Sequence, residues 1–352
     1  MAEAQQTLDI TAPLAFNRWL SEQRASLAFT TYQTGTLFAL GLDREGRIAV
    51  DSIHLKRCMG LWASASGRSL WVAARDQIWR FNNILPAGNT WEGHDAIYAT
   101  QASWTTGDLD VHDLARDAKD RLVFVNTRYN CLSIAGELHH FSPLWQPSFI
   151  SGMGVGDRCH LNGLALRNGK VAHVSALARS TVPQGWREAK RDGGVVIDPN
   201  TDETVVEGLS MPHSPRWAEG RLWLLESGTG SFGYVDLARG RFESILFCPG
   251  YPRGLAFHNQ YALIGLSLPR EQSGFAGLRL DEELGRRGMA PCCGLMVIDL
   301  RRAEPLFLVK MEGAVQELYD VAVLPGVRRP RWIGLDSGDI HYLLGVGPRQ
   351  AL

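Results

Sequence analysis

The chain has 352 residues, of which 45% are hydrophobic and 21% charged, a composition that excludes a disordered or fibrous protein. Lys and Arg total 36 against 37 Asp and Glu, which leaves a net charge of −1. Proteins that neutralise nucleic-acid phosphates need a basic excess, so a nucleic-acid partner is not expected.

Three further features concern the compartment. The first twenty residues lack the basic start and apolar run of a secretory signal. No stretch approaches the roughly 20 apolar residues of a membrane span. The six cysteines contain no CxxC pair, which argues against a zinc ribbon and for reduced thiols. We therefore expect a cytoplasmic protein that does not bind membranes.

In chain order, short apolar runs lie next to many of the 37 glycines, a pattern typical of short β-strands joined by turns. Only residues 15–23 and 278–287 show a helical pattern, so alternating βαβ units are not expected. The predicted fold class is all-β.

One pattern recurs six times: a tight turn, a polar residue, a strand, a turn and a second strand. The six copies are CMGLWASASGRSLWVAA, VHDLARDAKDRLVFVN, HLNGLALRNGKVAHVS, HSPRWAEGRLWLLE, PRGLAFHNQYALIGL and LYDVAVLPGVRRPRWIGL. Aligned at Met59, His112, Asn162, Ser214, Arg253 and Tyr319, they are spaced by about 53, 50, 52, 39 and 66 residues. A four-stranded blade needs about 40 to 50 residues, so the repeat predicts a six-bladed β-propeller.

The two ends of the chain are expected to close this ring. The last copy ends soon after its second strand, predicted at 331–335, and cannot complete its own blade. Three strand-like runs at 26–32, 36–42 and 47–53 precede the first copy and can pair into the last blade, which removes exposed edges. Residues 1–25 then form an extension, and 26–345 form one propeller.

Two segments exceed the length that a blade needs. They lie near 178–193, which contains Trp186 and Arg187, and near 269–291. Long insertions on a rigid scaffold often cover or line a binding site, although a loop without function is equally compatible with the sequence.

The first residues of the inner strands of a propeller converge near the central channel. Three of the six copies begin with histidine, at His112, His160 and His213, and three such imidazoles can hold one divalent transition metal with an open position. Zinc or iron fits best, and manganese or copper remains open. The alternative for each histidine is a hydrogen-bonded structural residue.

Arg253 and Tyr319 are expected to face the same cavity. A guanidinium can hold a carboxylate through two bonds, and a phenol can transfer a proton, as can Asp320. A structural ion pair of Arg253 with Asp320 or Glu226 is the alternative. The remaining candidates would orient the imidazoles, and one carboxylate, such as Glu226, could itself bind the metal or its water; structural turn residues are the alternative. These candidates are Asp110, Asp113, Asn162, Glu226 and Glu317.

Two cysteines, Cys58 beside Met59 and Cys159 beside His160, suggest a thiolate nucleophile. Buried cysteines are commonly inert, and this is the alternative.

The strings DVHDLA, RCHLNGLAL, GLSMPHSPRW, RLWLLESGTGSFGYVD, YPRGLAF and QELYDVAVLPGV resemble those of a bacterial family of conserved hypothetical proteins, often described as a domain of unknown function, over about 27–336. That resemblance implies no activity. By architecture, the site is also similar to that of the peptidyl-hydroxyglycine amidating lyase. The likeness implies that His112, His160 and His213 match its zinc ligands and that Arg253 and Tyr319 match its acid–base pair. Gluconolactonase-like propellers are similar in architecture, but three histidines disfavour their calcium.

Together these features predict a metal-dependent lyase, hydrolase or oxygenase that acts on a small or peptide-borne anionic substrate. Two alternatives remain: a non-catalytic peptide- or protein-binding propeller, and a metal-free enzyme built on Arg253, Tyr319 and Asp320. The sequence does not determine the oligomeric state.

Overall fold

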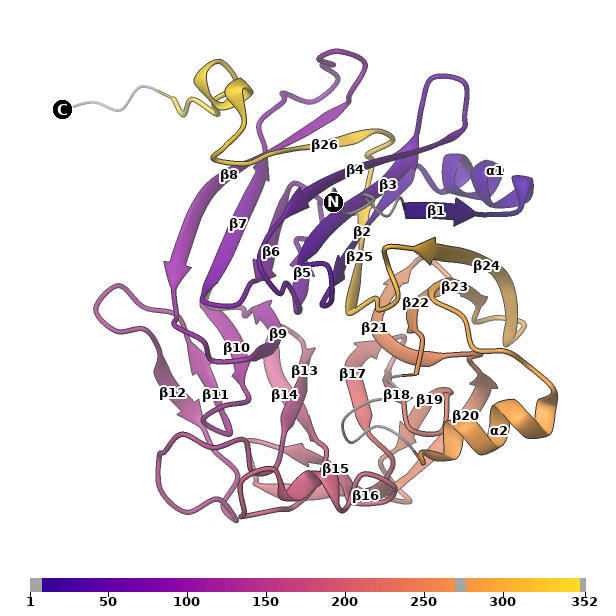
Figure 1. Cartoon of the computed structure of the whole chain (residues 1–352). Coiled ribbons are helices and arrows are strands. Elements are labelled where there is room, and N and C mark those ends of the chain that lie inside the picture. Colours follow the sequence, from indigo (N-terminus) through magenta and orange to yellow (C-terminus); the bar gives the residue numbers. More distant parts are fainter. Residues whose placement is uncertain (1–7, 270–276, 349–352) are drawn as a thin grey trace, which may run out of the picture.

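The computed structural model describes residues 8–269 and 277–348 and forms a ring of six antiparallel sheets around a central axis (Figure 1). This confirms the predicted all-β, six-bladed propeller. Each of the first five repeats supplies the innermost strand and the adjoining hairpin strand of a blade, and the outer strands come from the sequence between repeats.

Blades 1 to 5 each consist of four consecutive strands, and the two insertions lie between the second and third strands of blades 3 and 5. Blade 1 consists of β5 (Leu61–Ala63), β6 (Ser69–Ala73), β7 (Gln77–Asn83) and β8 (Ala96–Thr105). Blade 2 consists of β9 (Val111–Arg116), β10 (Leu122–Asn126), β11 (Cys131–Ile134) and β12 (Ser142–Trp145). Blade 3 consists of β13 (Leu161–Arg167), β14 (Lys170–Ala176), β15 (Gly194–Asp198) and β16 (Glu203–Leu209). Blade 4 consists of β17 (Pro212–Ala218), β18 (Arg221–Glu226), β19 (Ser231–Asp236) and β20 (Arg241–Phe247). Blade 5 consists of β21 (Tyr251–His258), β22 (Tyr261–Ser267), β23 (Gly294–Asp299) and β24 (Glu304–Gly313).

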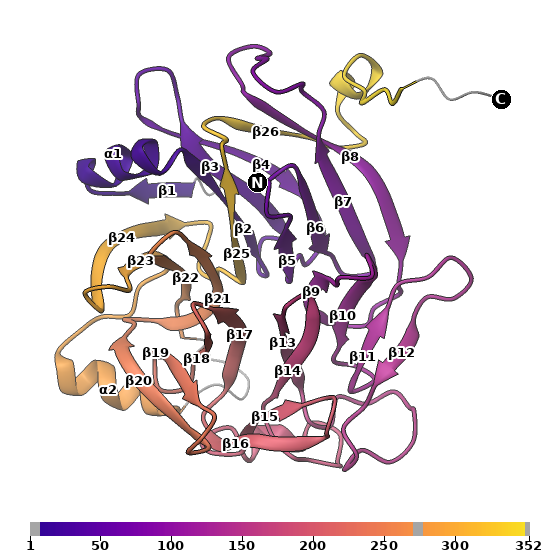
Figure 2. The ribbon, with the colours of Figure 1, turned by 180° about the vertical axis from the view of Figure 1, so that it is seen from behind.

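Blade 6 closes the ring by joining the two ends of the chain. Its innermost strand, β25 (Asp320–Pro325), pairs with β2 (Ala25–Thr31), which is followed outward by β3 (Thr36–Leu42) and β4 (Ile48–His54). The pairing runs from Ala25 opposite Pro325 to Thr30 opposite Asp320, and Figure 2 shows the two segments side by side. The predicted closure by amino-terminal strands is confirmed.

The prediction that 331–335 forms the second strand of the last blade was wrong. The edge of β25 that such a strand needs is already paired with β2. Instead β26 (Pro330–Ile333) runs parallel to β8 at the outer edge of blade 1. Its Trp332 is buried against the rings of Phe81 and Tyr98, at centroid distances of 5.5 and 5.1 Å, so aromatic packing fixes the segment there.

The described part of the extension 1–25 packs on blades 5 and 6, and its last residue, Ala25, begins β2. There β1 (Leu8–Thr11) pairs with β24, and α1 (Leu14–Gln23) buries Phe16 and Leu20 against the sheets. Residues 1–7 lie outside the described residues. Both ends of the chain therefore add strands to outer edges of the ring.

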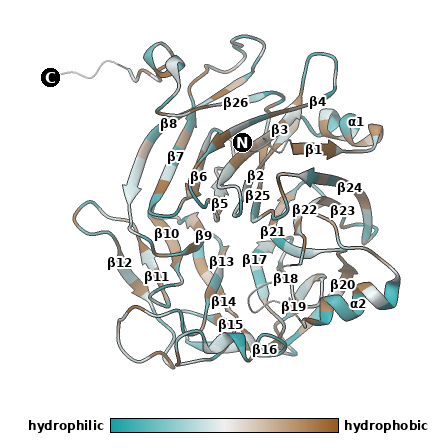
Figure 3. Cartoon of the chain, in the orientation of Figure 1, coloured by the Kyte–Doolittle hydropathy of each residue, from teal (hydrophilic) through white to brown (hydrophobic). Residues whose placement is uncertain are grey.

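Clusters of buried apolar residues join neighbouring blades; one of them brings Val123 of blade 2 together with Leu161 and Val174 of blade 3. Figure 3 shows the hydrophobic positions along the strands. In β10 all five residues are buried. Blades approach most closely near the axis, where two glycines follow the first residues of their repeats. A Cβ on Gly60 would lie 2.9 Å from Cα of Asp113, and one on Gly254 would lie 2.6 Å from Cα of Asp320. The missing side chains let the blades meet there.

The two insertions pack against each other on one face of blades 3 to 5. The first carries a short 3-10 turn (Gly185–Arg187), and the described part of the second carries α2 (Arg279–Arg287); residues 270–276 lie outside the described residues. Arg191 donates to the Gly277 carbonyl at 3.0 Å and pairs with Glu282 at 2.7 Å. No helix in the described ranges is long and apolar enough to cross a membrane.

Candidate functional site

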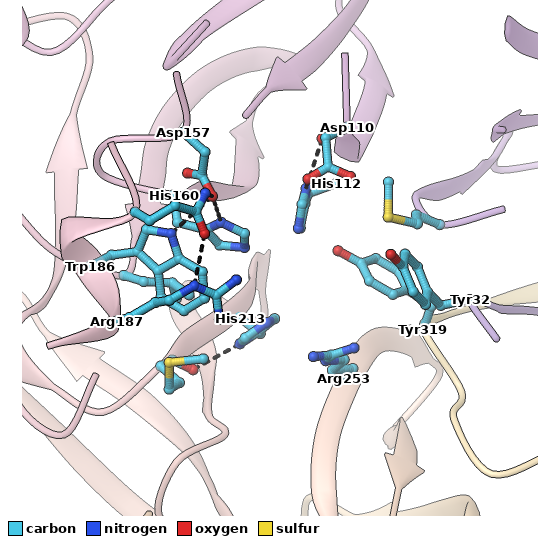
Figure 4. Close-up of a pocket in the computed structure, with 14 residues that line it drawn as sticks. Tyr32, Asp110, His112, Asp157, His160, Trp186, Arg187, His213, Arg253 and Tyr319 are labelled. Carbon is cyan, nitrogen blue, oxygen red and sulfur yellow. Dashed lines mark hydrogen bonds and ion pairs between the residues drawn. The ribbon is translucent and has the colours of Figure 1, made fainter. Parts of the chain in front are cut away.

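A pocket of about 180 Å³ lies where the inner strands begin around the axis (Figure 4). It is lined by Tyr32, Met59, Asp110, His112, Asp157, His160, Leu177, Gln184, Trp186, Arg187, Met211, His213, Arg253 and Tyr319. The six residues predicted to lead the copies into the channel, from Met59 and the three histidines to Arg253 and Tyr319, are all among them. The repeat therefore brings together side chains that are far apart in the sequence.

Two of the imidazoles are fixed by the backbone just before their own strands. Nδ1 of His112 lies 2.7 Å from the Asp110 carbonyl, and Nδ1 of His213 lies 2.8 Å from the Met211 carbonyl. A carbonyl oxygen only accepts hydrogen bonds, so Nδ1 carries the proton in both rings. Nε2 of each neutral ring then keeps its lone pair for another partner.

Hydroxyl groups at the ends of the second strands support the same two rings. Thr127 Oγ1 lies 2.8 Å from Nδ1 of His112, and Ser227 Oγ lies 3.0 Å from Nδ1 of His213. Each hydroxyl donates its proton to a carbonyl of the next blade, that of Leu161 at 2.6 Å or Pro252 at 2.6 Å. The hydroxyls can therefore only accept from the imidazoles, in agreement with a proton on Nδ1.

His160 is fixed by a side chain instead. Its Nδ1 lies 2.7 Å from Oδ2 of Asp157. Burial alone would raise the pKa of Asp157, but the interactions with His160 and the hydrogen bonds hold it below its usual range. The carboxylate is therefore ionised and accepts the Nδ1 proton, so in the neutral form of this ring the lone pair is on Nε2 as well.

Burial keeps two of the imidazoles neutral. It lowers the pKa of His112 to about 4, with the neighbouring Asp110 opposing the shift. It also lowers the pKa of His213 well below the usual value, and the charge of Arg253 adds to the effect. Neutral imidazole is the form that binds metals or accepts a proton.

The three rings surround the pocket without closing on one point. The centroids of His112 and His160 are 4.6 Å apart, and the ring of His213 lies 5.5 Å from that of Tyr251. Within the described ranges no group of three or more His, Cys, Asp or Glu side chains is arranged to hold a metal ion. The rings share a cavity, and as they stand they do not form a finished ligand set.

Arg253 and Tyr319 form the opposite wall of the pocket. The guanidinium is buried between the rings of Tyr251 and Tyr319, at 4.7 and 5.3 Å from their centroids, and Glu317 lies 4.0 Å from it. The buried Tyr319 hydroxyl has no hydrogen-bond partner among the described residues, and burial raises the pKa of Tyr319 well above the usual value. Tyr319 is therefore a proton donor directed at whatever occupies the pocket (Figure 4).

The other predicted carboxylates have different surroundings. Asp113 and Asp320 both pair with Arg216, at 2.7 and 3.7 Å, and accept backbone N–H groups of neighbouring blades. Glu226 accepts from Ser210 N at 2.9 Å and Thr229 Oγ1 at 2.7 Å, in a turn. None of these carboxylates is among the residues that line the pocket.

Asn162 is buried, and its Nδ2 has no hydrogen-bond partner among the described residues.

The two cysteines are also buried, which raises the pKa of Cys58 to about 12 and that of Cys159 further still. At neutral pH both remain thiols, which argues against a thiolate nucleophile.

Sequence reasoning missed the groups that hold the imidazoles and the centre of the ring: Asp157, Thr127, Ser227 and Arg216. One sign of the hydroxyls is present in the sequence. Thr127, Ser227 and Ser267 all follow the apolar run of a second strand, and all three donate to a carbonyl of the next blade. The role of Arg216 depends on contacts across the ring and has no local pattern.

A protein-family model described as a domain of unknown function, DUF4915, matches residues 14–333. No curated protein matches the chain. Among solved structures, a chain of a nidogen/laminin complex has a TM-score of 0.53 at 11% identity, over 86% of this chain and 99% of that chain. Virginiamycin B lyase from Staphylococcus aureus has a TM-score of 0.41 at 12% identity, over 74% and 96%. Apo AztD from Citrobacter koseri has 0.45 at 10%, over 90% and 98%. At such identities a structural likeness concerns the fold alone.

Proposed function

The chain belongs to the family described as a domain of unknown function, DUF4915, and we propose that its axial pocket is the active site of a metal-dependent enzyme for small anionic substrates. One observation carries this proposal. Three imidazoles from consecutive blades are each bonded through Nδ1 to an acceptor, which leaves Nε2 of every ring available to the same pocket.

The donor set suits a divalent transition metal. Metal-binding histidines almost always donate their second ring nitrogen to a carbonyl or carboxylate, as His112, His160 and His213 do here. Imidazole ligands favour zinc or iron, with manganese or copper as further possibilities. Such an ion would supply Lewis acidity or a bound water of lowered pKa. Binding would require these side chains to rearrange, since the described residues contain no group of three arranged to hold an ion.

Arg253 and Tyr319 define the substrate. The buried guanidinium can hold a carboxylate or another planar anion, and the Tyr319 hydroxyl can donate to a neighbouring oxygen. The cavity of about 180 Å³ is slightly larger than the 150 Å³ site that accommodates benzene. A substrate of roughly ten non-hydrogen atoms fits, and a peptide could insert only one side chain or terminus.

A second candidate is a metal-free acid–base enzyme. It is favoured because no group of three donor side chains in the described ranges is arranged to hold a metal ion. In that case His160, paired with Asp157, is the better base than Asp320, which is tied to Arg216 outside the pocket lining.

The test is elemental analysis and zinc titration of the wild type and of a variant with His112, His160 and His213 all changed to Ala. We expect about one ion per chain, lost in the triple variant. His173→Ala is the matched control, because His173 is a buried histidine outside the pocket that accepts from Trp217. A wild type that neither contains nor binds metal would favour the acid–base enzyme or a non-catalytic binding propeller.

A further inference from the structure

We propose that Asp157 is a positioning residue that couples the insertion 178–193 to His160, so that the tautomer and direction of this imidazole depend on the docked insertion. This rests on the proposed function only where His160 is taken as a ligand or base. The coupling itself concerns side chains of this chain alone.

One carboxylate oxygen connects the two parts. Oδ2 of Asp157 accepts from Nδ1 of His160 at 2.7 Å, from Nε1 of Trp186 at 2.9 Å and from Nε2 of Gln184 at 3.1 Å. The backbone N–H of Gln184 donates to the Asp157 carbonyl at 2.6 Å. Two residues of the insertion and one imidazole of the site therefore share a single acceptor (Figure 4).

Trp186 contacts His160 a second time through its ring. The centroids of the two rings are 4.4 Å apart at an interplanar angle of 37°, and the Trp186 side chain is 1% exposed. The indole thus covers one face of the imidazole while its N–H is bonded to the same carboxylate. Rotation of the His160 ring requires both contacts to be lost.

The other two imidazoles do not depend on an insertion. His112 and His213 are bonded to carbonyls two residues earlier and to hydroxyls of their own blades, all of which belong to the propeller itself. Asp110 provides the comparison. Its carboxylate lies 3.9 Å from Nδ1 of His112, and its backbone carbonyl makes the hydrogen bond.

The insertion is in turn supported by α2. Trp186 shares an apolar cluster with Leu278, Leu280 and Leu284, and Arg191 bonds to Gly277 and Glu282. Displacement of the insertion therefore has a cost in buried apolar area. Asp157 connects this packed unit to one ring of the site, and such outer partners typically change metal affinity by 10–100-fold.

The experiment reads the tautomer directly. Nitrogen-15 NMR of histidine-labelled protein, with His160 assigned through His160→Gln, reports which ring nitrogen carries the proton. Hydrogen exchange of 178–193 reports docking, and zinc titration reports affinity. In Asp157→Ala we expect a mixture of His160 tautomers, faster exchange in the insertion and a 10–100-fold loss of zinc affinity. Asp157→Asn keeps an accepting oxygen and should restore much of the Nδ1–H form.

Two further variants guard against simple misfolding. Trp186→Phe keeps an aromatic ring and removes the N–H donor. Hydrogen exchange in the insertion should therefore become faster while the protein stays folded. Asp110→Asn removes a carboxylate near His112 that makes no hydrogen bond to it, and should leave the His112 tautomer unchanged. A His160 that stays entirely Nδ1–H in Asp157→Ala, or an unchanged exchange rate there, overturns the coupling. A tautomer change in a protein that binds no zinc supports the coupling and removes the metal from the proposed function.

Discussion

Arg216 is the centre of a buried ion cluster that joins three alternate blades across the axis. Its guanidinium bonds to both oxygens of Asp113, at 2.7 and 3.2 Å, and lies 3.7 Å from Asp320. It also donates to the carbonyls of Leu164 and Pro215. Arg216→Ala would leave two nearly buried carboxylates without their cation. Breaking a buried pair in this way costs about 3–5 kcal/mol.

The Arg216 side chain is 23% exposed, which places the expected loss at the lower end, about 3 kcal/mol. For a chain of this length the entropy of unfolding is about 0.7 kcal/mol/K, so the melting temperature should fall by about 4 °C. Urea unfolding gives the free energy, and calorimetry gives the melting temperature.

A double-mutant cycle separates the ion pair from loss of packing. Arg216→Met keeps most of the side-chain volume, and Asp113→Asn removes one charge of the pair. We expect a coupling energy of about 1–3 kcal/mol between the two changes. Purely additive effects, or a loss below about 1 kcal/mol in Arg216→Ala, would refute the view that this cluster holds the blades together.

Three further predictions concern single positions near the axis. Burial raises the pKa of Asp320 to about 7, so the folded state binds this proton more tightly than the unfolded chain. The free energy of unfolding should therefore fall as the pH rises from about 4 through 7. Urea unfolding across this range should show a flatter pH profile in Asp320→Asn. Gly254→Ala should lower the free energy of unfolding by more than about 1 kcal/mol, because φ is +70° and the added Cβ would lie 2.6 Å from Cα of Asp320. A melting temperature equal to that of the wild type would contradict this. Tyr319→Phe removes a buried hydroxyl that has no partner in the described part of the chain, so the melting temperature should be at least that of the wild type; any loss of activity would then reflect the hydroxyl's contact with substrate.

The sequence predicted the ring because each blade repeats a local pattern that needs no knowledge of distant contacts. The amino-terminal strands could be assigned to the last blade by counting strands, since a closed ring leaves no free edge. The position of β26 could not be obtained in this way. It depends on whether Trp332 finds its aromatic partners in blade 1 or blade 6, and both blades offer apolar strands of similar composition.

The pocket residues were predictable for the same reason, and their partners were not. His112, His160 and His213 were found from their place in the repeat, and the structure brings all three to one pocket. Asp157 lies in an irregular segment before β13, where no periodicity indicates which way a side chain points. Asp113 and Asp320 were expected beside the imidazoles, but a carboxylate next in sequence to a pocket residue points away from it along a strand.

This alternation explains how one short segment serves both the site and the ring. On each inner strand the leading side chain enters the pocket, and the following residues meet the next blade. Asp113 accepts from Leu164 N, Ser214 accepts from Gly254 N and Asp320 accepts from Leu61 N. A change at a leading residue can therefore alter chemistry while these bonds between blades remain. A change at the next residue first weakens the contacts between blades, and it affects the site only as a consequence. Two neighbouring positions test this distinction. We expect His213→Ala to abolish ligand binding with a smaller loss of stability. We expect Ser214→Ala to lower the free energy of unfolding by about 1 kcal/mol while the folded fraction still binds.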